Sequence, residues 1–71
     1  MLRYSILIQY DDRDGIYVAS IPELQGCMAH GETQEDAIKE IQVALELWLE
    51  TAAEVGISVP EPMVYARSAT L

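Results

Sequence analysis

The sequence predicts a single α+β domain of order β-β-β-α-β, in which one long helix packs on one face of a three-stranded antiparallel sheet and a short last strand follows. Three observations predict this fold class. Apolar and polar residues alternate over the first ten positions, and helical periodicity extends over residues 37–55. The chain has 71 residues, of which 51% are apolar, and neither a repeat nor a linker divides it. We therefore expect one domain over residues 1–71.

The first two strands are predicted to form a hairpin. Side chains alternate over Leu2–Tyr10 in the manner of a half-buried strand. The Asp-rich turn over residues 11–15 ends in Gly15, which adopts a positive φ at no steric cost. Ile16–Ile21 returns as the second strand and stops before Pro22, because proline has no amide hydrogen to donate to the sheet.

A short third strand leads into the helix. The strand is predicted over Cys27–His30, and Thr33 is a suitable N-cap for a helix that runs to about Val55 and stops at Gly56. Beyond the helix, Met63–Ala66 is expected to return as the last short strand. The apolar stripe of the helix that is expected to face the core consists of Ala37, Ile38, Ile41, Ala44, Leu45, Trp48, Leu49, Ala52 and Val55.

A single helix leaves the other side of the sheet uncovered. The alternation in the first strand places four apolar residues on the side expected to face the helix, namely Tyr4, Ile6, Ile8 and Tyr10. Leu7, Tyr17 and Ile21 are then expected on the opposite side. Either a second subunit packs there, or these residues lie at the margins of the sheet. We favour the second subunit and expect a dimer or tetramer, because the apolar residues exceed what so small an interior can bury.

The charge balance is strongly acidic. Twelve acidic and four basic residues give a net charge of −8, which disfavours direct nucleic-acid binding, since phosphate contacts require a basic surface. It favours a basic partner instead. The N-terminus has no apolar signal sequence, and glutamates interrupt the apolar stretches of the helix. We expect a cytoplasmic protein without a membrane segment.

Residues for catalysis and for metal binding are few. Cys27 is the only cysteine and His30 the only histidine, so the chain can form neither an internal disulfide nor a closed zinc site. Three residues apart on a strand, the two side chains point to opposite faces, and we expect Cys27 to pack as a small apolar residue. Asp11, Asp12 and Asp14 resemble a calcium loop faintly, but a solvated hairpin turn is the preferred interpretation. The four glycines are isolated from one another, so no phosphate-binding loop is predicted. We expect no catalytic residues, no metal and no cofactor.

The outward face of the helix is the candidate partner-binding surface. Val43 and Leu47 form an apolar pair away from the core stripe, and acidic residues surround them. This face is either a solvated surface that maintains solubility or the centre of an interface with a basic or amphipathic partner. The candidate partner-binding residues are Val43, Leu47, Glu46, Glu50, Glu54 and Glu40.

Taken in order, several segments resemble the N-terminal domain of HicB-type antitoxins, and the resemblance covers nearly the whole chain. The segments are Tyr4-Ser5-Ile6, the Asp-rich turn with Gly15-Ile16-Tyr17-Val18-Ala19-Ser20, Ile21-Pro22-Glu23-Leu24-Gln25-Gly26-Cys27, Gly31-Glu32-Thr33-Gln34-Glu35-Asp36-Ala37, Leu47-Trp48-Leu49 and Pro60-Glu61-Pro62. Gln25 stands where the family motif usually has proline.

The resemblance implies a partial RNase H-like fold and an antitoxin role. The implied partner is a small basic RNA-cleaving toxin, similar to HicA, which the antitoxin neutralises by direct binding. Many longer relatives add a C-terminal DNA-binding domain, which is not expected here, so we expect no direct DNA binding. Ribonuclease H chemistry is not expected either, because the first strand has no acid before Asp11 and the helix acids point outward.

Two function classes follow from these observations. The first is an antitoxin of a type II toxin-antitoxin pair. The alternative is a solitary HicB-like oligomeric interaction module with no toxin partner and no catalytic activity. A third and weaker hypothesis, a degenerate enzyme that uses His30, has no reaction to assign to it.

Overall fold

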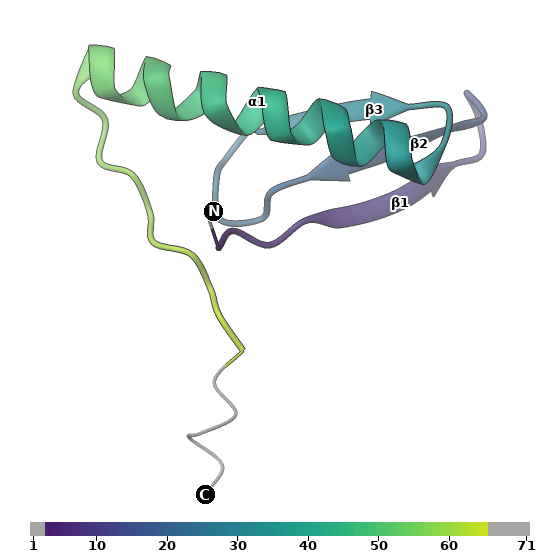
Figure 1. The fold of residues 1–71 in the computed structure, drawn as a ribbon, viewed down its shortest axis with the longest axis horizontal. Coiled ribbons are helices and arrows are strands. Elements are labelled where there is room, and N and C mark those ends of the chain that lie inside the picture. Colours follow the sequence, from purple (N-terminus) through teal and green to yellow (C-terminus); the bar gives the residue numbers. More distant parts are fainter. Residues whose placement is uncertain (1–2, 66–71) are drawn as a thin grey trace, which may run out of the picture.

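A computed structural model describes residues 3–65 of the chain. Three strands precede one long helix, and the helix crosses one face of the sheet (Figure 1). The elements are β1 (Leu7–Asp11), β2 (Ile16–Ser20), β3 (Met28–Gly31) and α1 (Gln34–Val55). The predicted α+β class and the order of these four elements are confirmed. The implied likeness to ribonuclease H stays a prediction.

The strands form an antiparallel sheet of order β1-β2-β3. In the turn between β1 and β2, the Gly15 amide donates to the Asp11 carbonyl over 2.8 Å, and the φ of Gly15 is 67°. The Asp11 side chain also accepts a hydrogen bond from the Arg13 amide at 2.9 Å. The acidic turn is therefore held by local hydrogen bonds, as turn chemistry predicts.

The face of the sheet that meets α1 follows from the strand register. Ile8 pairs with Ala19, and Ala19 pairs with Ala29, so all three side chains share the side of the core. Tyr17 was expected on the side away from the helix, and this is wrong, because it packs against the core on the same side as Ala19. It pairs directly with Tyr10, and the centres of their rings are 5.1 Å apart. Direct partners in an antiparallel sheet always share a face.

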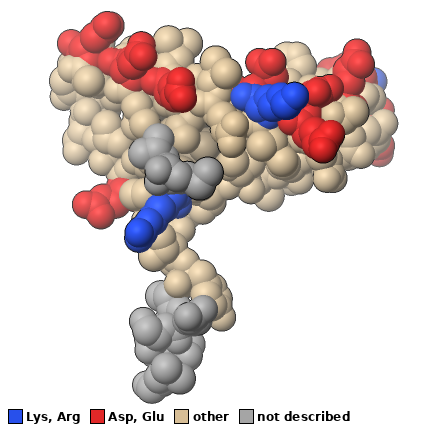
Figure 2. All heavy atoms as spheres, viewed as in Figure 1, with Lys and Arg blue, Asp and Glu red and all other residues tan. Residues whose placement is uncertain are grey.

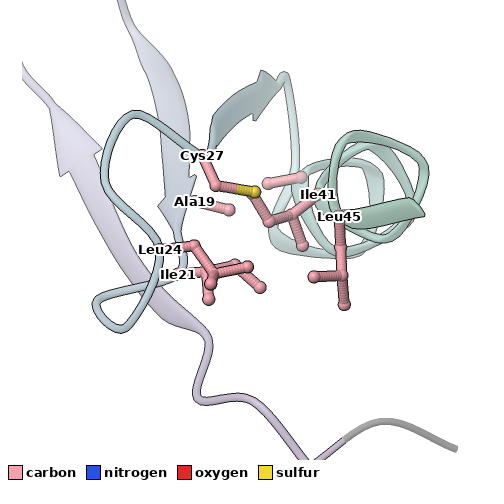
Figure 3. Packing of buried hydrophobic residues seen from close by; sticks show 7 residues of the cluster. Ala19, Ile21, Leu24, Cys27, Ile41 and Leu45 are labelled. Atoms are coloured by element: carbon pink, nitrogen blue, oxygen red, sulfur yellow. The ribbon is translucent and has the colours of Figure 1, made fainter. Parts of the chain in front are cut away.

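Ile21 was expected on the open side and is instead among the most buried residues, with 2% of its surface exposed. It packs with Leu24 and Cys27 of the following loop against Ile41 of α1 (Figure 3). The loop is closed by hydrogen bonds between the Ile21 amide and the Cys27 carbonyl and between the Cys27 amide and the Leu24 carbonyl. Cys27 thus belongs to this loop, and β3 begins one residue later than predicted.

The last strand predicted over Met63–Ala66 is not formed in its described part, residues 63–65, and Ala66 lies outside the described residues. The first strand also starts later than predicted, since residues 3–6 are not in a strand and Leu2 is not described. In both segments, hydrogen bonds between side chains and backbone groups hold the chain where backbone pairing of two strands was expected. Tyr4 donates its hydroxyl hydrogen to the Pro60 carbonyl at 2.6 Å, and Glu23 accepts the amide hydrogens of Ser5 and Met63.

The helix has the predicted ends. The Thr33 hydroxyl accepts the Asp36 amide hydrogen at 3.0 Å, and Gly56 has a left-handed conformation with φ 77°. Within the predicted core stripe, Ile38 and Val55 are exposed, which differs from the prediction. A helix of 22 residues is about 33 Å long, whereas strands of five residues extend about 17 Å. The end of α1 therefore projects beyond the sheet (Figure 1).

Candidate functional site

The candidate surface is the outward face of α1, which we call the acidic helix face. Val43 and Leu47 lie one helical turn apart and are 63% and 62% exposed. The four acids of this face, all exposed, are Glu40, Glu46, Glu50 and Glu54. The structure thus leaves every residue of the predicted surface accessible to a partner.

Helical geometry brings these acids around the apolar pair. Glu40 and Glu46 each lie three residues from Val43, and Glu50 lies three residues from Leu47, which are neighbouring positions on a helix surface. Glu54 follows one turn after Glu50. Acidic side chains gather over both ends of α1, with a basic side chain among them at one end and uncharged surface between the two groups (Figure 2). Lys39 is the basic residue of α1 and lies beside Glu40. The arrangement is an apolar centre with an acidic rim.

The last turn of α1 contains no basic residue, so acids stand where the helix dipole favours cations. Like charges four residues apart cost roughly 0.2–0.5 kcal/mol per pair. This placement reduces the stability of the isolated helix slightly. A basic partner would relieve both effects.

A loop supports the projecting half of α1 beside this face. The indole nitrogen of Trp48 donates a hydrogen bond to the Gln25 carbonyl at 3.0 Å. Between the loop and the helix lies a cavity of about 580 Å³. Met28, Ala44, Leu47, Trp48 and Ile57 supply most of its apolar lining. Leu47 therefore belongs both to the acidic helix face and to this cavity.

The two residues considered for catalysis are kept apart. Cys27 is 3% exposed, and burial raises the pKa of its thiol, which lowers the fraction of reactive thiolate. His30 is exposed and shares with Val18, its β2 partner, the face of the sheet away from α1. The interpretation of Cys27 as a small apolar core residue is confirmed.

The residues considered for metal binding form no recognisable site. Among residues 3–65, no group of three or more His, Cys, Asp or Glu side chains is placed to hold a metal ion. Asp11 uses its carboxylate to accept the amide hydrogens of the turn. In the described residues, the acidic segment therefore serves as the turn of the β1–β2 hairpin.

Two features were missed in the sequence. Glu23 was assigned only to a loop, although its carboxylate joins the two ends of the described chain, and no pattern of neighbouring residues indicates such distant partners. The open face of the sheet was predicted correctly at Leu7 and wrongly at Tyr17 and Ile21, and its other apolar residues were missed. Its apolar members are Leu7, Ile16, Val18 and Met28, which the strand register would have identified.

Within the described residues, no helix combines the length and the apolar character needed to span a bilayer.

Comparisons with known proteins identify the family. The chain is 47% identical over 59 residues to a UPF0150 protein of Synechocystis sp.. The matched region covers 83% of this chain and 80% of that protein. A UPF0150 protein of Thermoplasma acidophilum is 30% identical over 59 residues, covering 83% of this chain and 84% of its own length. One from Archaeoglobus fulgidus is 32% identical over 54 residues, covering 76% and 77%. The family model described as HicB-like antitoxin of bacterial toxin-antitoxin system matches residues 4–69, and the chain therefore belongs to the HicB-like antitoxin family.

Proposed function

We propose that this chain neutralises a small basic RNA-cleaving toxin, similar to HicA, by binding it directly through the acidic helix face. Membership of the antitoxin family supports a toxin-antitoxin role. The observation that carries the finer proposal is the exposed pair Val43 and Leu47 within a rim of glutamates. An RNA-cleaving protein needs a basic surface to hold its substrate, and an acidic protein that covers this surface competes with RNA for it.

Under this proposal the chain acts by binding alone and performs no catalysis. The apolar pair supplies the desolvated centre of the interface, where most of the affinity of a protein complex arises. The surrounding glutamates raise the association rate with a basic partner and make it sensitive to salt. A cytoplasmic location agrees with the cytoplasmic RNA that such a toxin would cleave.

The test is capture of partners from the lysate of the source cells, using the full chain on a resin at low and at high salt. We expect mass spectrometry to identify one small basic protein that is retained at low salt and weakened at high salt. The purified partner should cleave RNA, and an equimolar amount of the chain should suppress the cleavage. A retained protein whose RNA cleavage is unaffected by the chain would contradict the proposal.

Charge-reversal variants test the location of the interface. The triple variant Glu46→Lys, Glu50→Lys and Glu54→Lys should weaken the affinity for the partner by about tenfold or more at low salt. The matched control reverses three exposed acids elsewhere: Asp12→Lys, Asp14→Lys and Glu61→Lys. Both proteins gain the same charge, so equal affinities would reject the acidic helix face. Lysines near the C-terminus of a helix interact favourably with the helix dipole and stabilise the helix. A loss of binding by this variant would therefore not be caused by unfolding of α1.

The second candidate function is a solitary oligomeric module. It is supported by the open face of the sheet, where Leu7 and Met28 are 46% and 60% exposed beside the half-buried Val18. Recovery of only the chain itself at both salt concentrations would favour this module over the antitoxin.

A further inference from the structure

The outer edge of β3 is open in the described part of the chain. In the sheet order β1-β2-β3, β3 is a terminal strand, and its ladder partners are all in β2. The backbone amide and carbonyl groups on its other side have no strand partner among residues 3–65. Such an edge offers a row of hydrogen-bonding groups to an extended peptide.

This edge borders a groove between β3 and α1, which we call the β3–α1 groove. Its first part is the apolar cavity of about 580 Å³, lined on its apolar side by Met28, Ala44, Leu47, Trp48 and Ile57. Its second part, about 510 Å³, lies beside the rest of β3 and the start of α1. Met28 lines both parts, so they adjoin along one strand.

The second part of the groove is acidic. Glu32, Asp36 and Glu40 line it with a single basic residue, Lys39. All four side chains are exposed. The groove therefore combines an apolar end and an acidic end beside one unpaired strand edge.

We propose that an extended segment of the basic partner binds in the β3–α1 groove as an added strand beside β3. The segment carries an apolar side chain for the cavity at Leu47 and Trp48, and Lys or Arg side chains for the acids at the other end. Alternate residues of a strand point to the same side, so these side chains are two or four residues apart in the partner. This inference rests on the proposed function and specifies the partner element that the chain recognises.

Charge complementarity favours this occupant over a second copy of the chain. An antiparallel second copy paired through β3 would place its acidic end over the apolar end of the groove, where the carboxylates would lose water without a counter-charge. A parallel second copy would bring the two acidic ends together. A helix in the groove would leave the edge groups of β3 unpaired, because a helix bonds its own backbone internally.

The test uses the full chain, labelled with ¹⁵N, and a synthetic peptide as the probe. The peptide is an acetylated and amidated ten-residue strand in which Thr alternates with Leu, Leu, Arg, Lys and Arg. We expect saturable shifts of the amide resonances of residues 28–32 and 44–48. Absence of saturable shifts at millimolar peptide, or shifts confined to β1, would overturn the proposal.

Two pairs of variants, each with the same change in charge, test the two ends of the groove. Leu47→Glu should weaken peptide affinity by about tenfold, while Gln42→Glu should leave it within about twofold, since Gln42 is exposed on α1 but does not line the groove. Glu40→Gln should weaken it by about threefold, and Gln42→Lys less than that. Equal effects within either pair would overturn the role of that end.

Backbone pairing is tested with two N-methylated peptides, methylated at alternate amides in the two possible phases. One phase should abolish binding and the other should preserve it, because only every second amide of a strand faces its neighbour. Equal effects of the two phases would overturn strand addition. Peptide binding without capture of any toxin would reject the proposed function alone, whereas toxin capture without peptide binding would reject the groove alone.

Discussion

Glu23 joins three parts of the chain that are distant in sequence. Its carboxylate accepts hydrogen bonds from the Ser5 amide at 3.0 Å, the Ser5 hydroxyl at 3.0 Å and the Met63 amide at 2.8 Å. Desolvation raises the pKa of this carboxyl, but the hydrogen bonds from Met63 and Ser5 outweigh it, so that the pKa lies below its ordinary value of 4.5. The charged form is therefore favoured in the folded protein.

This lowered pKa predicts a pH dependence of stability. Because the folded protein holds the Glu23 proton less tightly than the unfolded chain does, its stabilising contribution is fully present above about pH 4.5 and is lost as the pH falls through the folded pKa. Glu23→Gln should lower the unfolding temperature by a few degrees at pH 7 and by much less at pH 3. Thermal unfolding followed by circular dichroism measures both differences.

The control for this prediction is Glu61→Gln, which neutralises an exposed acid outside the Glu23 cluster. Its difference from the wild-type protein should be small at pH 7. If Glu23→Gln and Glu61→Gln behave alike at both pH values, the hydrogen bonds of Glu23 contribute nothing to stability.

At the scale of elements, the junction between β3 and α1 determines how closely the helix approaches the sheet. A Cβ atom on Gly31 would lie 2.5 Å from the Ala37 amide nitrogen and 2.6 Å from the Asp36 Cβ. Neither of these atoms can move without a shift of the first turn of α1. Gly31 thus allows the contact that buries Ala37 completely and starts the β3–α1 groove.

Gly31→Ala should therefore lower the free energy of unfolding by about 1–3 kcal/mol, the usual cost of overpacking at a well-packed site. Urea unfolding of the two proteins measures it. His30→Ala, at the neighbouring exposed position, should change the free energy of unfolding by only about 0.5 kcal/mol or less. A Gly31→Ala protein as stable as the wild type would show that α1 can move away from β3 freely.

The N-cap residue Thr33 also stabilises the start of α1. Thr33→Ala removes the hydroxyl that accepts the Asp36 amide hydrogen, and it should cost about 1 kcal/mol of stability. Thr33→Ser keeps an oxygen in the same place and should restore most of the loss in the same urea measurement. If the serine variant is as destabilised as the alanine variant, the cap does not explain the effect.

At the scale of the whole molecule, the candidate site and the open face of the sheet lie on different sides. The acids of the candidate site are on α1, whereas Leu7, Val18 and Met28 give the open face of the sheet an apolar part, with Asp11 and Asp14 at the end near the turn. Two copies of a chain with net charge −8 repel each other least when their acidic helices are far apart. We expect any self-association to occur through the sheet, which would leave the helices free for a basic partner.

Sedimentation equilibrium at micromolar concentration should accordingly give the mass of a dimer or tetramer. Leu7→Lys places a charge on the open face and should shift the mass toward the monomer, since Leu7 is already 46% exposed and the fold tolerates the change. Val43→Lys, on the acidic helix face, should leave the mass unchanged. A monomeric wild-type protein would contradict the expected self-association.

Local patterns were sufficient for most of the fold. The turn ending at Gly15, the cap at Thr33 and the stop at Gly56 each depend on residues within one element, and all three are confirmed. The predicted first strand is formed only from Leu7, and Ile6 and Tyr10, which were expected to face the helix, are 40% and 57% exposed. The exposure of Val43 and Leu47 follows from helical periodicity in the same way. Their role in binding a partner stays a prediction, because exposure permits binding without identifying what binds.

The errors concern relations between elements. The side occupied by Tyr17 depends on its register with Tyr10, and strand register is a property of two segments together. The segment before β1 and the segment after α1 are connected through Glu23 and Tyr4, so hydrogen bonds to side chains replace the expected strand pairing. No local pattern in either segment indicates this.

The sequence by itself determined the order of β1, β2, β3 and α1, the ends of the helix, the acidic outward face and the family resemblance. All of these are encoded in short-range spacing, where each residue acts on neighbours within about one turn or one strand. Only the tertiary structure decided which side of the sheet is open, how β3 and α1 border a groove, and how Glu23 ties the ends of the described chain together. These features require residues far apart in sequence to meet, and their partners are determined by packing of the whole chain rather than by local periodicity.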